Sequence, residues 1–535
     1  MKKIAFISQE FSIEKLPTYA GGLGILAGDI LYTANDFEYP FYGVTFVNKG
    51  GYAQYKIIDN EIRYEEEFFD PLEYFLKIDE KFHLDLKDLR IYFNVWLYNL
   101  PNAKLFLIDT DVPENEEKIR KLTRRLYYED DIEEKILKDL LLSLAPLVIF
   151  EKLDIKIDKY HINESHAGFL PIELLKRYKN IEEVKKMIVF TTHSPIAGID
   201  EFDYNLVEKY YNIPDDIKNI SGDKLSLTKI LLHLSGYSNA VSYKHKFVTE
   251  KLWGMKIDYI TNGVYHIRWV NEKLASLYDI YLPNWRKEPT VFAYAKYINI
   301  NEFRKVKEYL KENTVEYINT NGYLNKKFEN DRILISVKRR FTEYKRFHMI
   351  LWRLEKLEEL NRKYKIQVLI SGVWHPKDEY TKNAIKWIID IMSTLSTPVA
   401  LILRRGYEQE NYILSGSDLF LHIPRPPFEA SGTSWMRAGI NGTPTLFSRD
   451  GSAVEAIIDD YNGWFFGSER KYPDEPYNED LDIENFYNKL DYILNLYRNE
   501  KEKYLDVSLN AIKTIGSLFN SYRMFKEYIS KAYRT

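Results

Sequence analysis

The stretch ILISVKRRFTEYKR (residues 333–346) joins an apolar run to a dense cluster of charges. Its first five residues have the length and composition of a buried strand. Five lysines and arginines follow, and helical periodicity begins at Tyr344. A strand that leads through a polar segment into a helix is the repeating unit of parallel α/β sheets, where ligands bind at the carboxyl ends of strands. The alternative for such a basic run is a solvated charged surface.

The same alternation of apolar runs and helical patterns recurs along all 535 residues. Further strands are predicted at 4–7, 104–108, 188–192, 367–370 and 400–403, and helices at 133–150, 344–362, 383–391 and 505–519. We therefore expect an α/β protein with two doubly wound, Rossmann-like domains that face a cleft. The predicted division is 1–280 and 281–514, with a C-terminal helix at 515–535 that packs back on the first domain.

The composition, 45% hydrophobic and 29% charged, is typical of a globular protein. A net charge of −4 does not support a nucleic-acid or membrane partner. The absence of cysteine excludes disulfides and cysteine nucleophiles. The segment HINESH (161–166) lacks the helical spacing of a zinc motif, so no metal is expected. The start MKKIAFISQEF carries no cleavage signature, and we expect a cytoplasmic protein.

A glycine-rich loop, YAGGLG (19–24), follows the first predicted strand and opens a helical pattern. Glycines allow main-chain amides to approach an anion closely, and a helix start adds partial positive charge. Gly21 and Gly22 are therefore candidates to hold a phosphate. The alternative is a tight turn between a strand and a helix.

The run EASGTSWMR (429–437) follows the segment 417–420 and a proline-rich stretch, 424–427. Glu429 can accept hydrogen bonds from sugar hydroxyls, and Ser431, Gly432 and Thr433 offer amides and hydroxyls at a helix start. The alternative is a capped helix with Glu429 as a local charge.

These segments occur in the order and spacing of a known family, together with HINESHAGFLPIELL (161–175), VFTTHSPIAGIDEFD (189–203), SNAVSYKH (238–245) and ITNGVYHIRW (260–269). The chain resembles the glycogen (α-glucan) phosphorylases, and most closely their short, unregulated members. That resemblance implies the glycosyltransferase B-type fold. In the family, a lysine at the position of Arg437 forms a Schiff base with pyridoxal phosphate.

The resemblance also implies roles for individual residues. His193 and Asn239, with Glu429, would bind glucose, and Arg340 and Lys345, with Gly21 and Gly22, would bind the substrate phosphate. Further substrate contacts would come from Tyr407, Ser431 and Gly432, whereas Arg339, Thr433 and Arg437 would lie at the cofactor position. His193, Arg340, Lys345 and Glu429 are the implied catalytic residues.

Arg437 departs from the family pattern. A guanidinium stays protonated and is a poor nucleophile, so it cannot form the aldimine. We therefore expect no covalently attached pyridoxal phosphate, and either a non-covalent cofactor or none. Trp435 could fill volume that a pyridine ring would otherwise use, or could stack on such a ring.

Three functions follow from these observations. The first is a retaining glucosyltransferase that moves glucose between an α-1,4-glucan or maltooligosaccharide and phosphate, giving glucose 1-phosphate. The second is a cofactor-independent transferase that uses a nucleotide sugar, in which Arg437 contacts the distal phosphate. The third is a non-catalytic glucan-binding protein. A homo-oligomer is possible in each case.

Overall fold

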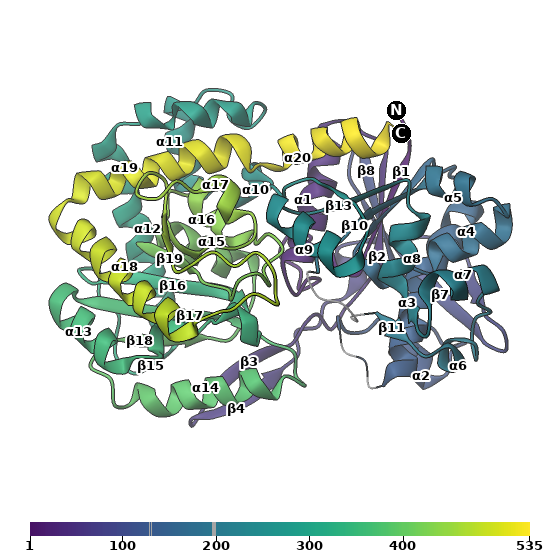
Figure 1. Cartoon of the computed structure of the whole chain (residues 1–535), viewed down its shortest axis with the longest axis horizontal. Helices are drawn as coiled ribbons and strands as arrows, with labels where there is room; N and C mark the ends of the chain where they lie inside the picture. The colour runs from purple at the N-terminus through teal and green to yellow at the C-terminus, as the bar shows by residue number, and fades with distance from the viewer. Residues whose placement is uncertain (128, 130, 195–199, 535) are drawn as a thin grey trace. The chain divides into compact units, whose positions relative to one another are not determined.

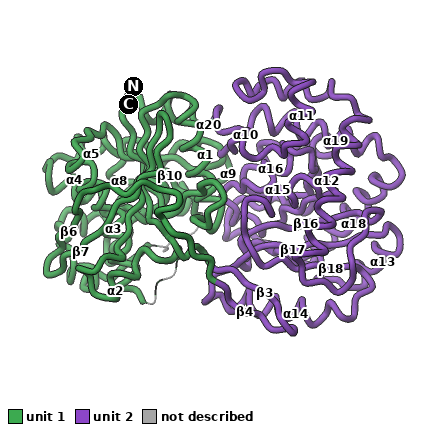
Figure 2. Tube along the Cα trace, turned by 180° about the vertical axis from the view of Figure 1, so that it is seen from behind, with its two compact units in different colours: residues 1–52, 66–261, 524–535 green, residues 53–65, 262–523 purple. Residues whose placement is uncertain are grey.

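The computed structural model describes residues 1–127, 129, 131–194 and 200–534 and contains two compact units (Figure 2). Unit 1 comprises Met1–Tyr52, Glu66–Thr261 and Met524–Thr535, and unit 2 comprises Ala53–Glu65 and Asn262–Arg523. The units therefore change at 261/262 and 523/524, whereas the sequence-based division was 280/281 and 514/515. The difference has a local cause, because the main chain at Val264 bonds to Phe519 and Ser521, which ties the two ends of unit 2 together.

Unit 1 is built on a ten-stranded sheet that is parallel except at one edge. In order its strands are β14 (Asp258–Tyr259), β13 (Tyr237–Ala240), β10 (Ile188–Thr191), β9 (Lys159–Asn163), β1 (Ile4–Ser8), β2 (Phe41–Phe46), β8 (Ala103–Asp109), β7 (Arg90–Asn99) and β5 (Leu76–Lys77), with β6 (Phe82–Asp85) paired to β7. The run from β14 to β8 is parallel, and β7 is antiparallel to β8, β5 and β6.

Strand β1 explains why both faces of this sheet are covered. Ala5 and Ile7 point into one apolar core, and Ile4 and Phe6 point into another. Successive side chains of a strand face opposite sides, so an all-apolar strand requires helices on both faces. Figure 1 shows helices on both sides of the sheet. The helices are α1 (Gly22–Asp36), α2 (Glu117–Arg120), α3 (Ile132–Lys152), α4 (Leu170–Tyr178), α5 (Ile181–Met187), α6 (Tyr204–Val207), α7 (Asp215–Ser221), α8 (Leu227–Leu234) and α9 (Tyr243–Trp253). A short antiparallel pair, β11 (Glu201–Phe202) and β12 (Leu225–Ser226), completes the unit.

The C-terminal segment from Met524 onward belongs to unit 1. It runs through the end of α20 (Ser521–Glu527) into a final helical turn, Tyr528–Tyr533. Phe525 and Tyr528 belong to the same apolar core as Phe6. The Tyr533 hydroxyl also lies 2.8 Å from Nδ1 of the buried His161.

Unit 2 contains a seven-stranded sheet in the order β15 (Tyr323–Leu324), β18 (Val399–Ile402), β17 (Ile366–Val373), β16 (Ile333–Arg340), β19 (Leu419–His422), β20 (Thr445–Ser448) and β21 (Trp464–Phe466). Only β15 is antiparallel to its neighbour. The helices are α10 (His266–Trp269), α11 (Glu272–Tyr281), α12 (Ile300–Asn321), α13 (Leu354–Tyr364), α14 (Glu379–Met392), α15 (Tyr407–Gly416), α16 (Ser434–Ile440), α17 (Ala453–Ala456), α18 (Glu479–Asn499) and α19 (Lys501–Ala511). The hairpin β3 (Gln54–Ile58) and β4 (Glu61–Glu65) also belongs to unit 2. The predicted α/β class with two parallel-dominated sheets is thus confirmed.

Two local expectations around β16 were wrong. The strand extends to Arg340, so the first three basic residues are part of it rather than of the following loop. This extension requires Gly372 on β17, because a Cβ there would lie 1.9 Å from the Arg339 carbonyl oxygen. The predicted helix 344–362 starts only at Leu354. Arg346 interrupts it, since its φ of 48° turns the chain while its buried guanidinium binds the Ile423 carbonyl and Asp482.

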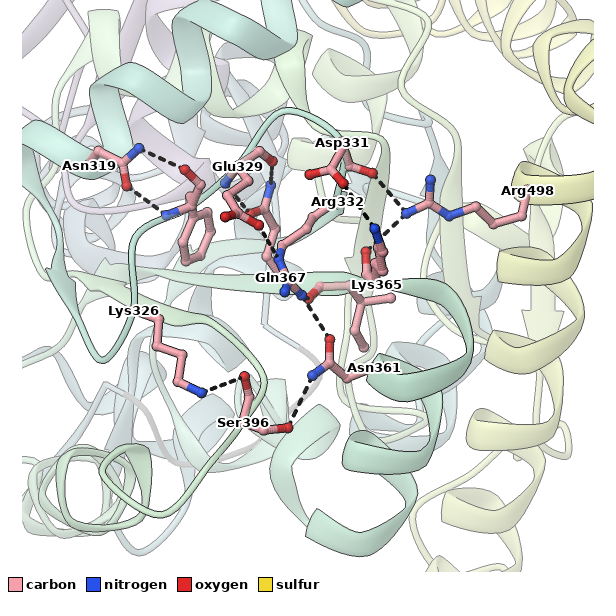
Figure 3. Close-up of polar contacts among 12 residues, drawn as sticks. Asn319, Lys326, Glu329, Asp331, Arg332, Asn361, Lys365, Gln367, Ser396 and Arg498 are labelled. Atoms are coloured by element: carbon pink, nitrogen blue, oxygen red, sulfur yellow. Dashed lines mark hydrogen bonds and ion pairs between the residues drawn. The ribbon is translucent and has the colours of Figure 1, made fainter.

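A polar network fastens the amino ends of β16 and β17 (Figure 3). Arg332 donates to Asn361 at 3.0 Å, and Asn361 donates to Ser396 at 3.2 Å. Gln367 donates to the Glu329 carbonyl at 2.9 Å. Gln367 and Asn361 are buried and their side-chain amides are paired, so the network stabilises this edge of the sheet. The opposite, carboxyl edge carries the candidate site.

Among the described residues, no helix has the length and apolar character needed to cross a membrane. Within the same residues there is no group of three or more histidine, aspartate or glutamate side chains suited to a metal ion.

Candidate functional site

Glu429 is the centre of a buried charge cluster in unit 2. Its Oε2 accepts from Arg339 Nη2 at 2.5 Å and from Lys345 Nζ at 2.6 Å. Burial alone would raise the pKa of Glu429, but Lys345 and Arg339 hold it well below its usual range. No described residue donates to Oε1 of Glu429, so that oxygen is available to a sugar hydroxyl. The resemblance gave these three residues separate roles, with Arg339 at the cofactor position, Lys345 at the substrate phosphate and Glu429 at glucose, and their direct pairing was not predicted.

His422 belongs to the same cluster and was missed by the sequence analysis. It ends β19, next to β16, and neither ring nitrogen has a hydrogen-bond partner within the described chain. Burial, with Arg339 nearby, keeps the pKa of His422 well below its usual value, so the imidazole is neutral. Arg339 Nη1 is likewise buried without a partner. Unpaired buried donors are costly, and their clustering indicates a place for an acceptor-rich group. The available signal was a histidine directly after the apolar run 419–421.

The Ser431–Thr433 turn lies against this imidazole. Gly432 has a φ of 78°, and a Cβ there would lie 2.5 Å from Cε1 of His422, so only glycine fits. The Ser431 hydroxyl is 2.8 Å from that of Ser452. Thr433 caps α16 without a side-chain capping bond. The turn therefore packs against the cluster through Gly432, while the hydroxyl of Ser431 is paired with that of Ser452.

Two further candidates lie at the ends of neighbouring elements. Arg340 is half-buried as the last residue of β16, opposite Val373 of β17. Tyr407 begins α15, and its hydroxyl donates to the Arg268 carbonyl at 2.5 Å. Its ring packs against Trp269, 5.5 Å between centroids. Tyr407 therefore braces a neighbouring segment, a role that the predicted substrate contact did not include.

Arg437 is buried and ion-paired with Glu410 of α15. Its guanidinium lies 4.4 Å above the Trp269 ring, and its Nε donates to the Thr433 carbonyl at 3.4 Å. Arg405 Nε binds the other oxygen of Glu410 at 3.1 Å. Glu410 thus already binds the guanidinium that was predicted to contact a distal phosphate. The resemblance did not reveal Glu410, because the pair joins residues 27 positions apart.

The neighbourhood of Arg437 is densely packed. Trp435 is fully buried, with its ring 5.6 Å from that of Phe447 and 5.4 Å from that of Phe519. Its Nε1 donates to the Ser431 carbonyl at 3.4 Å. A guanidinium bound to a carboxylate cannot serve as the primary amine that pyridoxal phosphate requires. The residues at this position therefore do not fit the family's cofactor chemistry.

In unit 1, His193 is fixed by the end of β9. Its main-chain N–H donates to Glu164 Oε2 at 2.8 Å, and its Nε2 lies 2.7 Å from Asn163 Oδ1. Burial, with His245 nearby, lowers the pKa of His193 to about 3, so the ring is neutral. Glu164 has a φ of 70°, a strained conformation for a residue with a side chain. The following loop, 195–199, lies outside the described residues, including the proline that follows His193.

Asn239 does not occupy the predicted sugar-binding role. Its side chain is fully buried, accepts from Thr191 Oγ1 at 2.9 Å and donates to the Ala240 carbonyl at 3.0 Å. The next asparagine in the same sequence pattern, Asn262, has a buried Oδ1 without a partner among the described residues. Asn262 is therefore the better candidate for a ligand contact, and Asn239 is structural.

The glycine loop also differs from expectation. The Gly21 amide donates to Oε2 of Glu10 at 3.1 Å, and the Ala20 amide donates to the same oxygen. Tyr127 donates to Oε1 of Glu10 at 3.0 Å. A carboxylate of the chain thus occupies the amino end of α1, where a substrate phosphate was predicted. Gly22 is the first residue of that helix.

Comparisons with known proteins give a consistent result. The model of the carbohydrate phosphorylase family matches residues 242–534. A glycogen phosphorylase of Aquifex aeolicus is 30% identical over 99% of this chain and 86% of its own length. A maltodextrin phosphorylase of Thermococcus litoralis is 29% identical over 99% of this chain and 70% of its own length. An uncharacterized protein of Methanocaldococcus jannaschii is 29% identical over the full length of both chains.

Proposed function

Because this chain belongs to the carbohydrate phosphorylase family, we propose that it is a retaining glucosyltransferase that moves glucose between an α-1,4-glucan and phosphate. The relatives named glycogen phosphorylase and maltodextrin phosphorylase support a glucan or maltooligosaccharide substrate. The product in the degradative direction is glucose 1-phosphate.

The observation that carries the proposal is the cluster around Glu429. Arg339 and Lys345 give it two cations against one carboxylate, and Arg339 Nη1 and His422 add buried donors without partners. Such a set suits a phosphate, which offers several acceptor oxygens and negative charge. We assign the phosphate to Arg339, Arg340, Lys345 and His422, and a glucose hydroxyl to Oε1 of Glu429.

Within unit 2, we assign Asn262 to a hydroxyl of the transferred glucose. Within unit 1, we assign His193 to a sugar hydroxyl, because its neutral imidazole can donate to or accept from one. Its attachment to Glu164 and Asn163 fixes its position before substrate arrives.

The proposed chemistry needs no pair of catalytic carboxylates. A phosphate oxygen attacks C1 of the terminal glucose from the face that the glucan leaves. The bond between C1 and the glycosidic oxygen breaks, and a phosphate proton moves to that oxygen. The cations lower the barrier by stabilising the phosphate as its charge redistributes.

The test is release of glucose 1-phosphate from maltooligosaccharide and phosphate, together with the reverse reaction. Lys345→Met should lower kcat/KM by about 10²- to 10³-fold, the usual cost of one electrostatic contact to a transition state. Lys326→Met is the matched control and should leave kcat/KM unchanged, because among the described residues Lys326 bonds only the exposed Ser396 carbonyl (Figure 3).

A folded wild-type protein that turns over in neither direction contradicts the proposal. Thermal stabilisation by ADP-glucose or UDP-glucose, but not by glucose 1-phosphate, would favour a nucleotide-sugar transferase instead. Glucan binding without turnover from any donor would favour a non-catalytic protein.

A further inference from the structure

The ion pair between Glu410 and Arg437 buries two opposite charges, which packing alone does not require. Both side chains are almost completely buried, and they come from adjacent helices, α15 and α16. Both Glu410 oxygens are engaged, one by Arg437 and the other by Arg405. Burying charge is expensive, so such a pair persists only when its partners and hydrogen bonds are complete.

More positive charge lies near Glu410 than one carboxylate can neutralise. Lys338 of β16 is also buried, and burial in the company of Arg405 and Arg437 lowers its pKa to about 7 despite the nearby carboxylate. Burial alone would raise the pKa of Glu410, but Arg437, Arg405 and Lys338 keep it ionised. Removing Glu410 would therefore leave buried cations without compensation.

The same carboxylate would disable a lysine placed at position 437. An aldimine requires a neutral amine, and a buried lysine beside an ionised carboxylate keeps its proton. The chain thus carries two separate obstacles to the cofactor, the guanidinium of Arg437 and the charge of Glu410. Trp435 adds a third by occupying volume next to them.

We propose that Glu410 and Arg437 together replace the cofactor attachment of the family, so that this chain holds no pyridoxal phosphate. The ion pair closes the position from within, and Trp269 covers its guanidinium. Under the proposed function, which this inference extends, the proton for the leaving glucan then comes from the substrate phosphate alone. Cofactor attachment at residue 437 is measured without any assay of glucose transfer. The inference about the cofactor and the proposed glucosyltransferase activity can therefore fail independently of each other.

The experiment compares four forms of the full chain: wild type, Arg437→Lys, Glu410→Gln, and the double variant. Each is incubated with pyridoxal phosphate, reduced with borohydride, and digested so that the mass of the peptide containing residue 437 is measured. Glutamine keeps the volume of Glu410 and removes its charge. Aldimine absorbance before reduction is the second readout, and the melting temperature and near-ultraviolet circular dichroism report folding.

We expect no adduct at residue 437 in wild type or Glu410→Gln. The double variant should form one, and Arg437→Lys should form at least about tenfold less, since each unit of pKa separates amine populations tenfold. Adding Trp435→Gly to the double variant should increase the adduct further.

Three results would overturn the inference. The first is wild-type protein that retains stoichiometric pyridoxal phosphate through dialysis, a measurement that needs no variant. The second is equal adduct in Arg437→Lys and the double variant, which would remove the role of Glu410. The third is a double variant that folds but forms no adduct at residue 437, whether or not Trp435→Gly is also present.

Discussion

Asn239 and Asn262 are separated by one short helix and one strand, yet their side chains do different work. Asn239 joins Thr191 and the Ala240 carbonyl inside unit 1, whereas the Oδ1 of Asn262 is buried without a partner among the described residues. Asn262→Ala should lower kcat/KM for maltooligosaccharide about 3- to 10-fold, the value of one neutral hydrogen bond, with little change in melting temperature.

Asn239→Ala is the paired comparison. It leaves the Thr191 hydroxyl without its acceptor and should lower the free energy of unfolding by about 1–3 kcal/mol. Steady-state kinetics and thermal unfolding separate the two effects. Loss of activity in Asn239→Ala at an unchanged melting temperature would show that the assignment is reversed.

Residue-scale roles were the hardest to predict from sequence. The resemblance named Arg339, Lys345 and Glu429 but gave them separate roles, and it did not predict that the three side chains form one cluster. It could not reveal Glu410, whose partner lies 27 residues away, nor show which of two buried asparagines of one pattern has its side-chain hydrogen bonds complete. Both depend on tertiary contacts, which carry no local signal.

At the scale of elements, α1 begins at a carboxylate that the chain itself supplies. Glu10 accepts from the Gly21 amide and from Tyr127. If phosphate competes for these amides, Glu10→Gln should lower the KM for phosphate about 2- to 5-fold, since an anion at a helix start is worth about 0.3–1 kcal/mol. Initial rates at varied phosphate concentration provide the measurement.

Glu14→Gln is the matched control, because Glu14 lies on the same segment as Glu10. Its carboxylate accepts from Tyr98 of β7, so its replacement should not affect the KM for phosphate. An unchanged KM for phosphate in Glu10→Gln, accompanied by a lower melting temperature, would mean that Glu10 only holds the loop.

Elements were predicted well where burial dictated composition. β1, β8 and β17 are apolar because both faces of their sheets are covered, and the ends of each lie within about three residues of the predicted range. The predicted β16 was too short, because charged residues usually mark the end of a buried strand. Its extension depends on Gly372, a residue of the neighbouring strand.

At the scale of the whole molecule, the C-terminal segment completes the core of unit 1. Phe525, Tyr528 and Tyr533 are buried among residues of β1, β2 and α1. Deleting residues 524–535 removes several large apolar side chains, each worth about 1.5–3 kcal/mol on burial, which together approach the stability of a typical domain. Calorimetry should show that the unit 1 transition is lost or strongly lowered, while that of unit 2 persists.

Deleting only residues 534–535 is the control, because Arg534 is exposed, and it should leave both transitions in place. Two unshifted transitions after the larger deletion would contradict this role for the segment. Hydrogen exchange in β1 and β2 gives an independent measure of the same effect.

The return of the C-terminal segment to unit 1 also sets an order of events during synthesis. The strands β1 and β2 of unit 1 precede unit 2 in the chain, but the core that they form lacks Phe525 and Tyr533 until all of unit 2 has been translated. Unit 2 ends at Arg523 and becomes complete first, although it starts later. The nascent amino-terminal sheet must therefore wait with apolar surface uncovered, which is the period when chaperones act and aggregation begins.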